Sequence, residues 1–278
     1  MVDIGNFSCT SFEIFDINLV QKEVDGGCIS VDQIDETIGN KPDAKTIVIS
    51  GLRQDTFEYF VKTYGGQFDA ISFWKNKLVG DLSPLGELKD IKFINYFFNQ
   101  RATSLWNMSG NTALKGLSIY DFSRLHSIAD IETAPNLEFF GIGDQVWAGM
   151  VIDSLKPVAK TNIKRFEWCG KTLLDNDYKC LAEGKIEVLD IDPTRFTIDE
   201  LTDLLALFPD MLSGSITKPY VTASIVTKDK EDCTTYNYLC KNKKVCVVGK
   251  DDERFSKYLN DFERLLAEKR SARNSKAI

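Results

Sequence analysis

Side chains that could support catalysis are few in this sequence of 278 residues. The single histidine, His126, cannot form a histidine-rich metal site or a pair of histidines for acid–base catalysis. A Ser–His or Cys–His pair would need a nucleophile that no local motif supplies. Aspartate and glutamate are abundant, but their spacing does not single out a glycosidase pair. We therefore predict no catalytic residue and no enzyme activity.

Motifs for cofactors and metal ions are also incomplete. A Gly-Lys-Thr sequence begins at Gly170, but Arg165 stands where a phosphate-binding loop has its first glycine. Gly141 and Gly143 lack the third glycine of a dinucleotide-binding fingerprint. The cysteines of the C-terminal region lack the close pairs typical of zinc sites: Cys233, Cys240 and Cys246. We expect no cofactor and no metal.

Composition narrows the possible partners and the compartment. A net charge of -7 and a pI of about 5.0 argue against a surface that neutralises phosphates, so we expect no nucleic-acid partner. The first 15 residues do not resemble a signal peptide, and no apolar run is long enough to cross a membrane. Seven scattered cysteines, an odd number, suit reduced thiols. These features predict a cytoplasmic protein without a membrane partner, in which the sequons at Asn6 and Asn107 are incidental.

A short apolar pattern recurs through the middle of the chain. Seven segments carry apolar residues at positions 1, 4 and 6, and successive segments begin 20 to 26 residues apart. Alternation at positions 4 and 6 is typical of a strand with one buried face. The intervening residues are long enough for the crossover that parallel strands require. The segments begin at Ala44, Phe68, Leu88, Leu114, Leu137, Ile163 and Ile186.

Because no single unit of this length can bury its own apolar face, neighbouring units must stack. The pattern therefore predicts an α/β solenoid with a parallel sheet of about seven strands. A conventional α/β sheet is the alternative.

One segment connects this pattern to a known family. Residues 68–78, FDAISFWKNKL, match the leucine-rich-repeat pattern L-x-x-L-x-L-x-x-N-x-L, with Phe and Ile in place of Leu. The chain resembles the leucine-rich-repeat family, in a degenerate form with short bacterial-type repeats, over about residues 44–193. In that family, stacked asparagines at position 9 bind backbone groups at the turns. Here Asn76 alone holds that position, and its counterparts are Tyr96, Phe122, Gln145, Lys171 and Thr194. We therefore expect irregular turns.

The flanking segments are expected to cover the open ends of the solenoid. Residues 1–43 form an N-terminal cap, with strands or a short helix at residues 12–17 and 29–34. Residues 44–195 form the solenoid. Residues 196–278 form a C-terminal cap or a small α/β module. They begin with a capping box between Thr197 and Glu200 and end in an amphipathic helix over residues 255–266.

Positions 3, 5 and 7 of each repeat are expected on the concave face. Position 7 holds Trp74, Ile94 and Tyr120 in three successive repeats, and aromatic residues are favoured anchors at interfaces. Acidic residues collect toward the C-terminal repeats. The alternative is that a shifted register or an N-terminal arm covers these aromatic side chains. The predicted binding residues are Trp74, Lys92, Ile94, Tyr96, Tyr120, Phe139, Arg165, Glu167, Asp190 and Asp192.

The sequence thus predicts a protein-binding module whose concave sheet holds a protein partner. Its role would be that of an adaptor, a regulator or a toxin-neutralising protein. One alternative is an enzyme with its site near residues 217–249. Another is a carbohydrate-binding surface protein that uses Trp74 and Tyr120 as stacking platforms.

Overall fold

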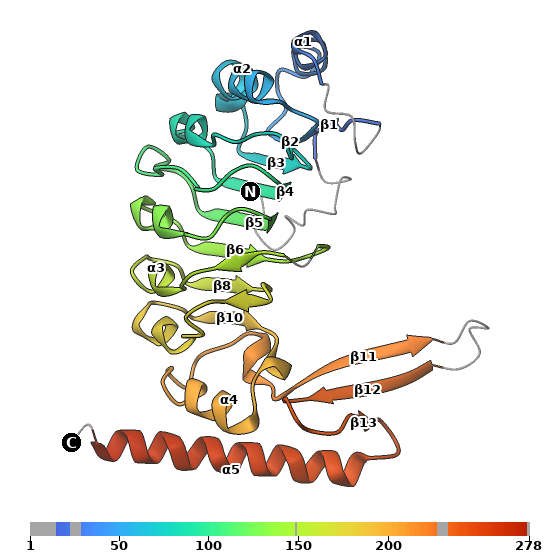
Figure 1. Ribbon diagram of the computed structural model, residues 1–278, viewed down its shortest axis with the longest axis vertical. Helices are drawn as coiled ribbons and strands as arrows, with labels where there is room; N and C mark the ends of the chain where they lie inside the picture. The colour runs from blue at the N-terminus through green and yellow to red at the C-terminus, as the bar shows by residue number, and fades with distance from the viewer. Residues whose placement is uncertain (1–14, 23–28, 148, 227–232, 277–278) are drawn as a thin grey trace. The chain divides into compact units, whose positions relative to one another are not determined.

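A computed structural model of the chain describes residues 15–22, 29–147, 149–226 and 233–276 (Figure 1). The chain divides into two compact units, Met1–Ile186 and Glu187–Ile278. Each unit is built around its own strands and helices. Among the described residues, no helix is both long enough and apolar enough to span a membrane.

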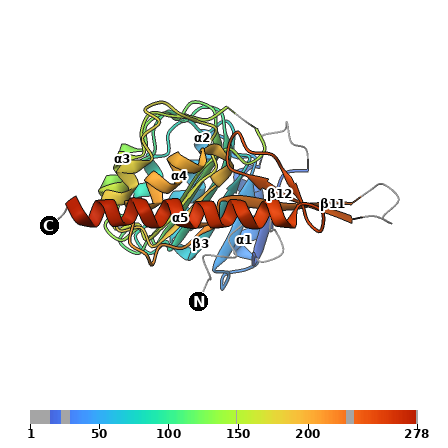
Figure 2. The same ribbon diagram turned by 90° about the horizontal axis from the view of Figure 1, so that it is seen from below.

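The described part of the first unit contains a sheet of seven parallel strands that lie in chain order (Figure 1). Parallel pairing of neighbours in sequence is the arrangement that a coil of short repeats produces. The strands are β1 (Ile17–Leu19), β2 (Thr46–Ser50), β3 (Ala70–Trp74), β4 (Phe93–Asn99), β5 (Gly116–Phe122), β6 (Phe139–Gly143) and β8 (Arg165–Trp168). In Figure 2 the coils of this unit overlie one another in projection.

The core of the first unit is a ladder of apolar side chains, one from each strand. Successive rungs pair directly in the sheet, as Ile71 does with Ile94 and Leu117 with Phe140. All are buried, and burial of each such side chain stabilises the fold by about 1.5–3 kcal/mol. The ladder residues at position 4 are Ile47, Ile71, Ile94, Leu117, Phe140 and Phe166. The unit is therefore a leucine-rich-repeat-like α/β solenoid, which confirms the predicted fold class.

The third repeat corrects the predicted register. The expected core residues were Leu88, Ile91 and Phe93, but the sheet pairs Phe93 with Ala70, so the repeat begins three residues later. Its core positions are Ile91, Ile94 and Tyr96, all buried. Residues 88–96 satisfy the 1, 4, 6 pattern in both registers, and only pairing with the neighbouring strand distinguishes them.

The returns from one strand to the next are short helices and turns. The helices are α1 (Val31–Gly39), α2 (Gln54–Tyr64) and α3 (Lys156–Ala159). The 3-10 turns are η2 (Gly65–Gln67), η3 (Ser83–Glu87), η4 (Ala129–Thr133) and η5 (Lys179–Glu183). Two short strands, β7 (Val151–Ile152) and β9 (Thr172–Leu173), pair with each other beyond the main sheet. At the N-terminal end, Ser30 and Gln33 form the capping box that begins α1.

The corrected register adds a second asparagine at position 9. Asn76 accepts the N–H of Leu52 and donates to the carbonyl of Ile49. Asn99 repeats this role one coil later, because it donates to the carbonyls of Asn76 and Val79 and accepts two backbone N–H groups. Both side chains are fully buried. The expectation that Asn76 stands alone is wrong, since it placed Tyr96 where Asn99 belongs.

The second unit begins with a strand of the same type, β10 (Val188–Ile191), in which Leu189 and Ile191 are buried. η6 (Pro193–Arg195), α4 (Ile198–Leu205) and η7 (Ser215–Thr217) follow. An antiparallel sheet is then formed by β11 (Tyr220–Val226), β12 (Cys233–Leu239) and β13 (Cys246–Val247). The unit ends in the long helix α5 (Asp252–Lys276), drawn in red in Figures 1 and 2.

Helix α5 is held against α4 by its basic C-terminal half. Lys269 forms ion pairs with Asp199 and Asp203. Arg273 donates to the carbonyls of Ala206 and Leu207, which lie at the end of α4 and have no partner within that helix. At its start, α4 carries the predicted capping box between Thr197 and Glu200. The two helices therefore stabilise each other through their ends.

Candidate functional site: an aromatic cluster at the ends of the strands

Five aromatic side chains meet where the central strands of the first unit end. Three of them occupy position 7 on β3, β4 and β5, and pair as direct neighbours: Trp74 with Phe97, and Phe97 with Tyr120. Alternation along each strand turns these side chains away from the core ladder. Phe98 and Trp147 complete the group. We call Trp74, Phe97, Phe98, Tyr120 and Trp147 the aromatic edge cluster.

The rings of the cluster are in direct contact, in stacked or tilted pairs. Trp74 lies 4.5 Å from Phe97 between ring centroids, and the rings are inclined by 27°. Trp147 lies 4.4 Å from Phe98 and 6.0 Å from Phe97. Contacts of this kind add about 0.5–1.5 kcal/mol beyond the area that they bury. The rings therefore hold one another in place.

Exposure rises from the base of the cluster to its rim. Phe97 and Tyr120 are buried, and Trp74 and Phe98 are half-buried. Trp147 is 45% exposed, and its neighbour Val146 is 62% exposed. An exposed tryptophan supported by a buried aromatic base is typical of an interface anchor.

A lysine ammonium lies over two of the rings. The Nζ of Lys75 is 5.2 Å from the centroid of Trp74 and 5.6 Å from that of Trp147. Both distances are within the range of a cation–π contact. Lys75 directly follows strand β3 and has a φ of 54°, in the left-handed region. Phe98 in β4 and Asp121 in β5 occupy the corresponding position 8 and have similar φ values, so this left-handed residue recurs in three successive repeats.

The loop that carries Trp147 is anchored by carboxylates. Asp121 accepts the N–H groups of Gln145 and Val146 at 2.9 and 3.0 Å, and that of Trp147 at 3.3 Å. Asp144 accepts three further backbone N–H groups around the same loop, from Gly149, Met150 and Lys171. These bonds fix the exposed tryptophan to the strands beneath it.

Burial raises the pKa of Asp121 although the three N–H groups oppose the shift, and the charge of Asp144 raises it further. When the pKa of a carboxyl is higher in the folded chain than in the unfolded chain, folding disfavours the ionised form of that carboxyl. Its contribution to stability therefore falls as pH rises from the unfolded pKa, 3.8, through the folded value. The structural role of Asp121 is therefore to accept the three backbone N–H groups, because its ionised form does not favour folding.

Replacement of this carboxylate is expected to loosen the loop. Asp121→Ala removes the acceptor of three backbone N–H groups, so amide hydrogen exchange at residues 145–147 should speed up by at least about tenfold. Asp121→Asn keeps one acceptor oxygen and should show a smaller increase. Exchange measured by NMR at neutral pH tests this. Equal exchange rates in Asp121→Ala and the unaltered chain would contradict the anchoring role.

The structure brings together several of the residues expected to bind. Trp74 and Tyr120 are part of the aromatic edge cluster, and the Tyr120 hydroxyl donates to Glu167 at 3.2 Å. Burial, with the charge of Glu167, raises the pKa of Tyr120. Phe139 lies beside Arg165 in the sheet, with the guanidinium 5.7 Å from its ring. These contacts bring three repeats into one surface.

Three other expected residues lie elsewhere because of the shifted register. Ile94 and Tyr96 belong to the buried core, so their predicted exposure on the concave face is wrong. The Tyr96 hydroxyl donates to the carbonyl of Asn76, and burial raises the pKa of Tyr96. Lys92 precedes β4 and forms an ion pair with Asp69 at 2.9 Å. Phe97 takes the place that was assigned to Ile94.

Sequence reasoning missed Phe97, Phe98, Lys75 and Trp147. Phe97 and Phe98 were hidden by the register of the third repeat. Trp147 lies in a turn, where alternation carries no information. The available signal was the aspartate at position 8 in two successive repeats, Asp121 and Asp144, because short acidic side chains accept backbone N–H groups at turns.

Asp190 and Asp192 belong to the second unit and bind backbone groups there. Asp190 accepts the N–H of Ser215 at 3.0 Å. Asp192 accepts both the N–H and the hydroxyl of Thr194. Glu167, which was expected to share an acidic patch with them, is part of the first unit. Asp190 thus links β10 to η7, and Asp192 stabilises the local turn at Thr194.

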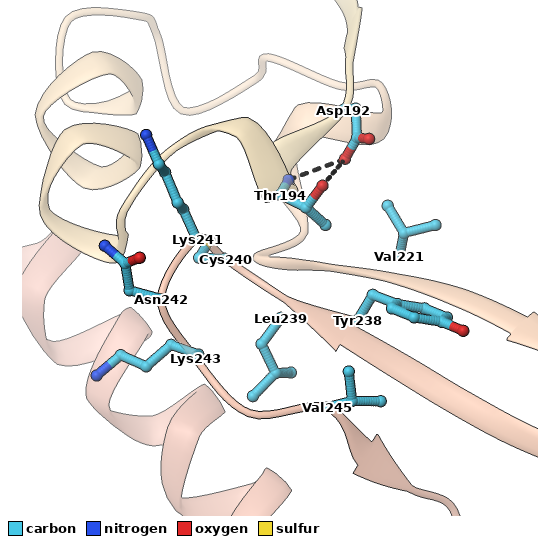
Figure 3. Close-up of a pocket in the computed structure, with 10 residues that line it drawn as sticks. All are labelled: Asp192, Thr194, Val221, Tyr238, Leu239, Cys240, Lys241, Asn242, Lys243 and Val245. Carbon is cyan, nitrogen blue, oxygen red and sulfur yellow. Dashed lines mark hydrogen bonds between the residues drawn. The ribbon is translucent and has the colours of Figure 1, made fainter.

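The second unit has an open cavity of about 450 Å³ beside the hairpin (Figure 3). Val221, Tyr238 and Val245 line one side, and Asp192 is the one carboxylate among the lining residues. Figure 3 shows Lys241 and Lys243 directed away from Tyr238 and Val221. Among the described lining residues there is neither a second carboxylate nor a histidine. Among the described residues, no group of three or more His, Cys, Asp or Glu side chains could hold a metal ion.

Comparisons with known proteins return similarities of fold. No family model matches the sequence, and no curated protein sequence matches it. An internalin from Listeria monocytogenes has 16% identity and a TM-score of 0.44, over 64% of this chain and 51% of that chain. The leucine-rich repeat domain of the type III effector XopL has 15% identity and a TM-score of 0.35, over 71% of this chain and 74% of that domain. The chain thus spans about half the length of the internalin structure.

Proposed function

We propose that this chain is a non-catalytic binding protein that holds a protein partner at the aromatic edge cluster. The observation that carries the proposal is Trp147, which is 45% exposed yet packed against Phe98 at 4.4 Å between ring centroids and anchored through its own N–H to Asp121. Tryptophan in such surroundings is the residue type that contributes most to protein interfaces. Because the loop and the rings are already fixed, little conformational entropy remains to be lost on binding.

A protein partner accounts for this surface better than a carbohydrate does. The sugar-binding alternative used Tyr120 as a stacking platform, and that ring is buried at the base of the cluster. The accessible part combines Trp147 with the aliphatic Val146, an apolar patch that suits protein side chains. By holding the partner, this protein would act as an adaptor, a regulator or a toxin-neutralising protein. A net charge of -7 would speed association with a basic partner.

We also propose a cytoplasmic location and three functional segments. Five described cysteines are free thiols, which supports a reducing compartment.

Residues 1–43 and 196–278 would cap or extend the solenoid of residues 44–195. The exposed hairpin of the second unit and its open cavity support an additional role for the last segment.

Capture of a partner from the source cells tests the proposed function. The immobilised full chain is compared with Trp147→Ala and with Met211→Ala, a control that removes an apolar side chain 90% exposed in the second unit. The partner should be retained by the unaltered chain and by Met211→Ala. Truncation of an interface tryptophan typically weakens binding by 2 kcal/mol or more, about 30-fold, so Trp147→Ala should lose the partner. Quantitative mass spectrometry of the eluates reports the difference.

The same experiment can refute the proposal. A protein retained equally by Trp147→Ala and the unaltered chain does not bind through the aromatic edge cluster. Binding of a purified glycan that depends on Trp147, without any such protein, would instead support the carbohydrate alternative.

A further inference from the structure

We infer that the aromatic edge cluster binds a basic side chain, lysine or arginine, of its protein partner between Trp74 and Trp147. In the free chain the ammonium group of Lys75 occupies that place. The inference rests on the proposed function, and it adds the chemistry that the partner must present.

The geometry of the two indoles suits a cation. Both rings lie within 6 Å of the same ammonium nitrogen, and tryptophan has the strongest cation–π attraction of the aromatic side chains. Trp74 stacks on Phe97, and Trp147 contacts both Phe98 and Phe97, so these rings restrict the rotation of both indoles. The cation site is therefore formed before any partner arrives.

The surrounding charges also favour a cation. Asp121 and Asp144 anchor the loop of Trp147, and they are close enough for the charge of Asp144 to raise the pKa of Asp121. Both carboxylates accept hydrogen bonds from backbone N–H groups, which bear no net charge. Glu167 adds a third carboxylate at the hydroxyl of Tyr120. Asp121 and Glu167 thus each form a hydrogen bond to a member of the cluster, and with Asp144 they give its surroundings a negative charge that favours a cation.

A cation of the partner can displace the ammonium group of Lys75. Among the described residues, its ammonium contacts the two indoles and forms no ion pair. A cation–π contact at a partly exposed site is weak, and the long lysine side chain can swing into solvent. An arginine would replace it with a planar group that stacks on indole faces better than an ammonium does. Lys75 thus keeps the site occupied until a stronger cation displaces it.

A pair of peptides that differ in charge alone tests the inference. The probes are Ac-Gly-Ser-Arg-Ser-Gly-amide and the same peptide with citrulline, the neutral isostere of arginine. Binding to the full chain is followed by NMR, through the indole N–H signals of Trp74 and Trp147. We expect the arginine peptide to shift both signals and the citrulline peptide to bind at least about threefold more weakly.

Substitution of Lys75 sharpens the test. Lys75→Met removes the competing ammonium and keeps an unbranched stem, so the arginine peptide should bind about two- to fivefold more tightly, the range of one exposed cation–π contact. Lys62→Met is the matched control for net charge, since Lys62 is exposed on α2, and it should leave the affinity unchanged. Trp147→Ala should abolish the shift of Trp74.

The outcomes separate the inference from the proposed function. Equal binding of both peptides, or unchanged affinity in Lys75→Met, would overturn the cation site. Capture of the cellular partner would then still depend on Trp147, and the proposed function would stand. Loss of that dependence would instead overturn the proposed function itself.

Discussion

Gly143→Ala is expected to lower the free energy of unfolding by about 2–6 kcal/mol, the combined range for backbone strain and overpacking in a packed interior. Gly143 has a φ of 140°, which residues with a side chain rarely adopt. A Cβ atom there would overlap the backbone N of Gly170 and lie 2.5 Å from the carbonyl carbon of Cys169. These atoms belong to the end of the neighbouring repeat, so neither backbone can yield without disturbing the pairing of β6 with β8.

Gly149→Ala is the matched control for this prediction. It adds the same methyl group a few residues away, where no atom lies within 4 Å of the added Cβ. Urea unfolding followed by far-UV circular dichroism should place the control near the unaltered chain and Gly143→Ala at a lower midpoint. Similar midpoints for both variants would mean that the ends of β6 and β8 do not approach each other as described.

Asn99→Ala is expected to lower the free energy of unfolding by about 3 kcal/mol. The substitution removes the donor to the carbonyls of Asn76 and Val79 and the acceptor of the N–H groups of Arg101 and Ala102. Because Asn99 is fully buried, water cannot replace these bonds in the folded state. Each buried group left without a partner costs about 1–3 kcal/mol.

Asn136→Ala tests whether any asparagine would have the same effect. Asn136 also donates to the carbonyl of the preceding repeat, at Thr112, but the bond is exposed to solvent. Its loss should lower the free energy of unfolding by about 1 kcal/mol or less. Thermal and urea unfolding of both variants give the comparison. A smaller effect at Asn99 than at Asn136 would refute the role of Asn99 at the turn.

The pattern of apolar residues determined the fold. Residues at positions 4 and 6 of each repeat, such as Leu117 and Ile119, must be buried, and repeats of this length bury them only by stacking. The free energy gained by burial is proportional to the apolar area removed from water and requires no specific partner. The buried positions can therefore be inferred without knowledge of contacts. The same reasoning placed Trp74 and Tyr120 on the opposite face from the core.

The tertiary structure alone decided the register of the third repeat. Residues 88–96 satisfy the repeat pattern twice, three residues apart, and both registers place large apolar residues at positions 1, 4 and 6. Pairing of Ile94 with Ile71 and Leu117 selects one of them. That choice moves Ile94 and Tyr96 into the core, brings Phe97 between Trp74 and Tyr120, and places Asn99 at the turn.

The tertiary structure also assembled the candidate site. Lys75, Phe98 and Trp147 come from three different repeats, and Lys75 and Phe98 have a left-handed backbone at or near the ends of their strands. Trp147 takes its place because Asp121, one repeat earlier, accepts its N–H group. Hydrogen bonds and ring stacking require particular distances and directions, whereas burial requires only that water be excluded. For that reason the sequence determined the stack of coils, and only the folded chain determined the surface that it presents to a partner.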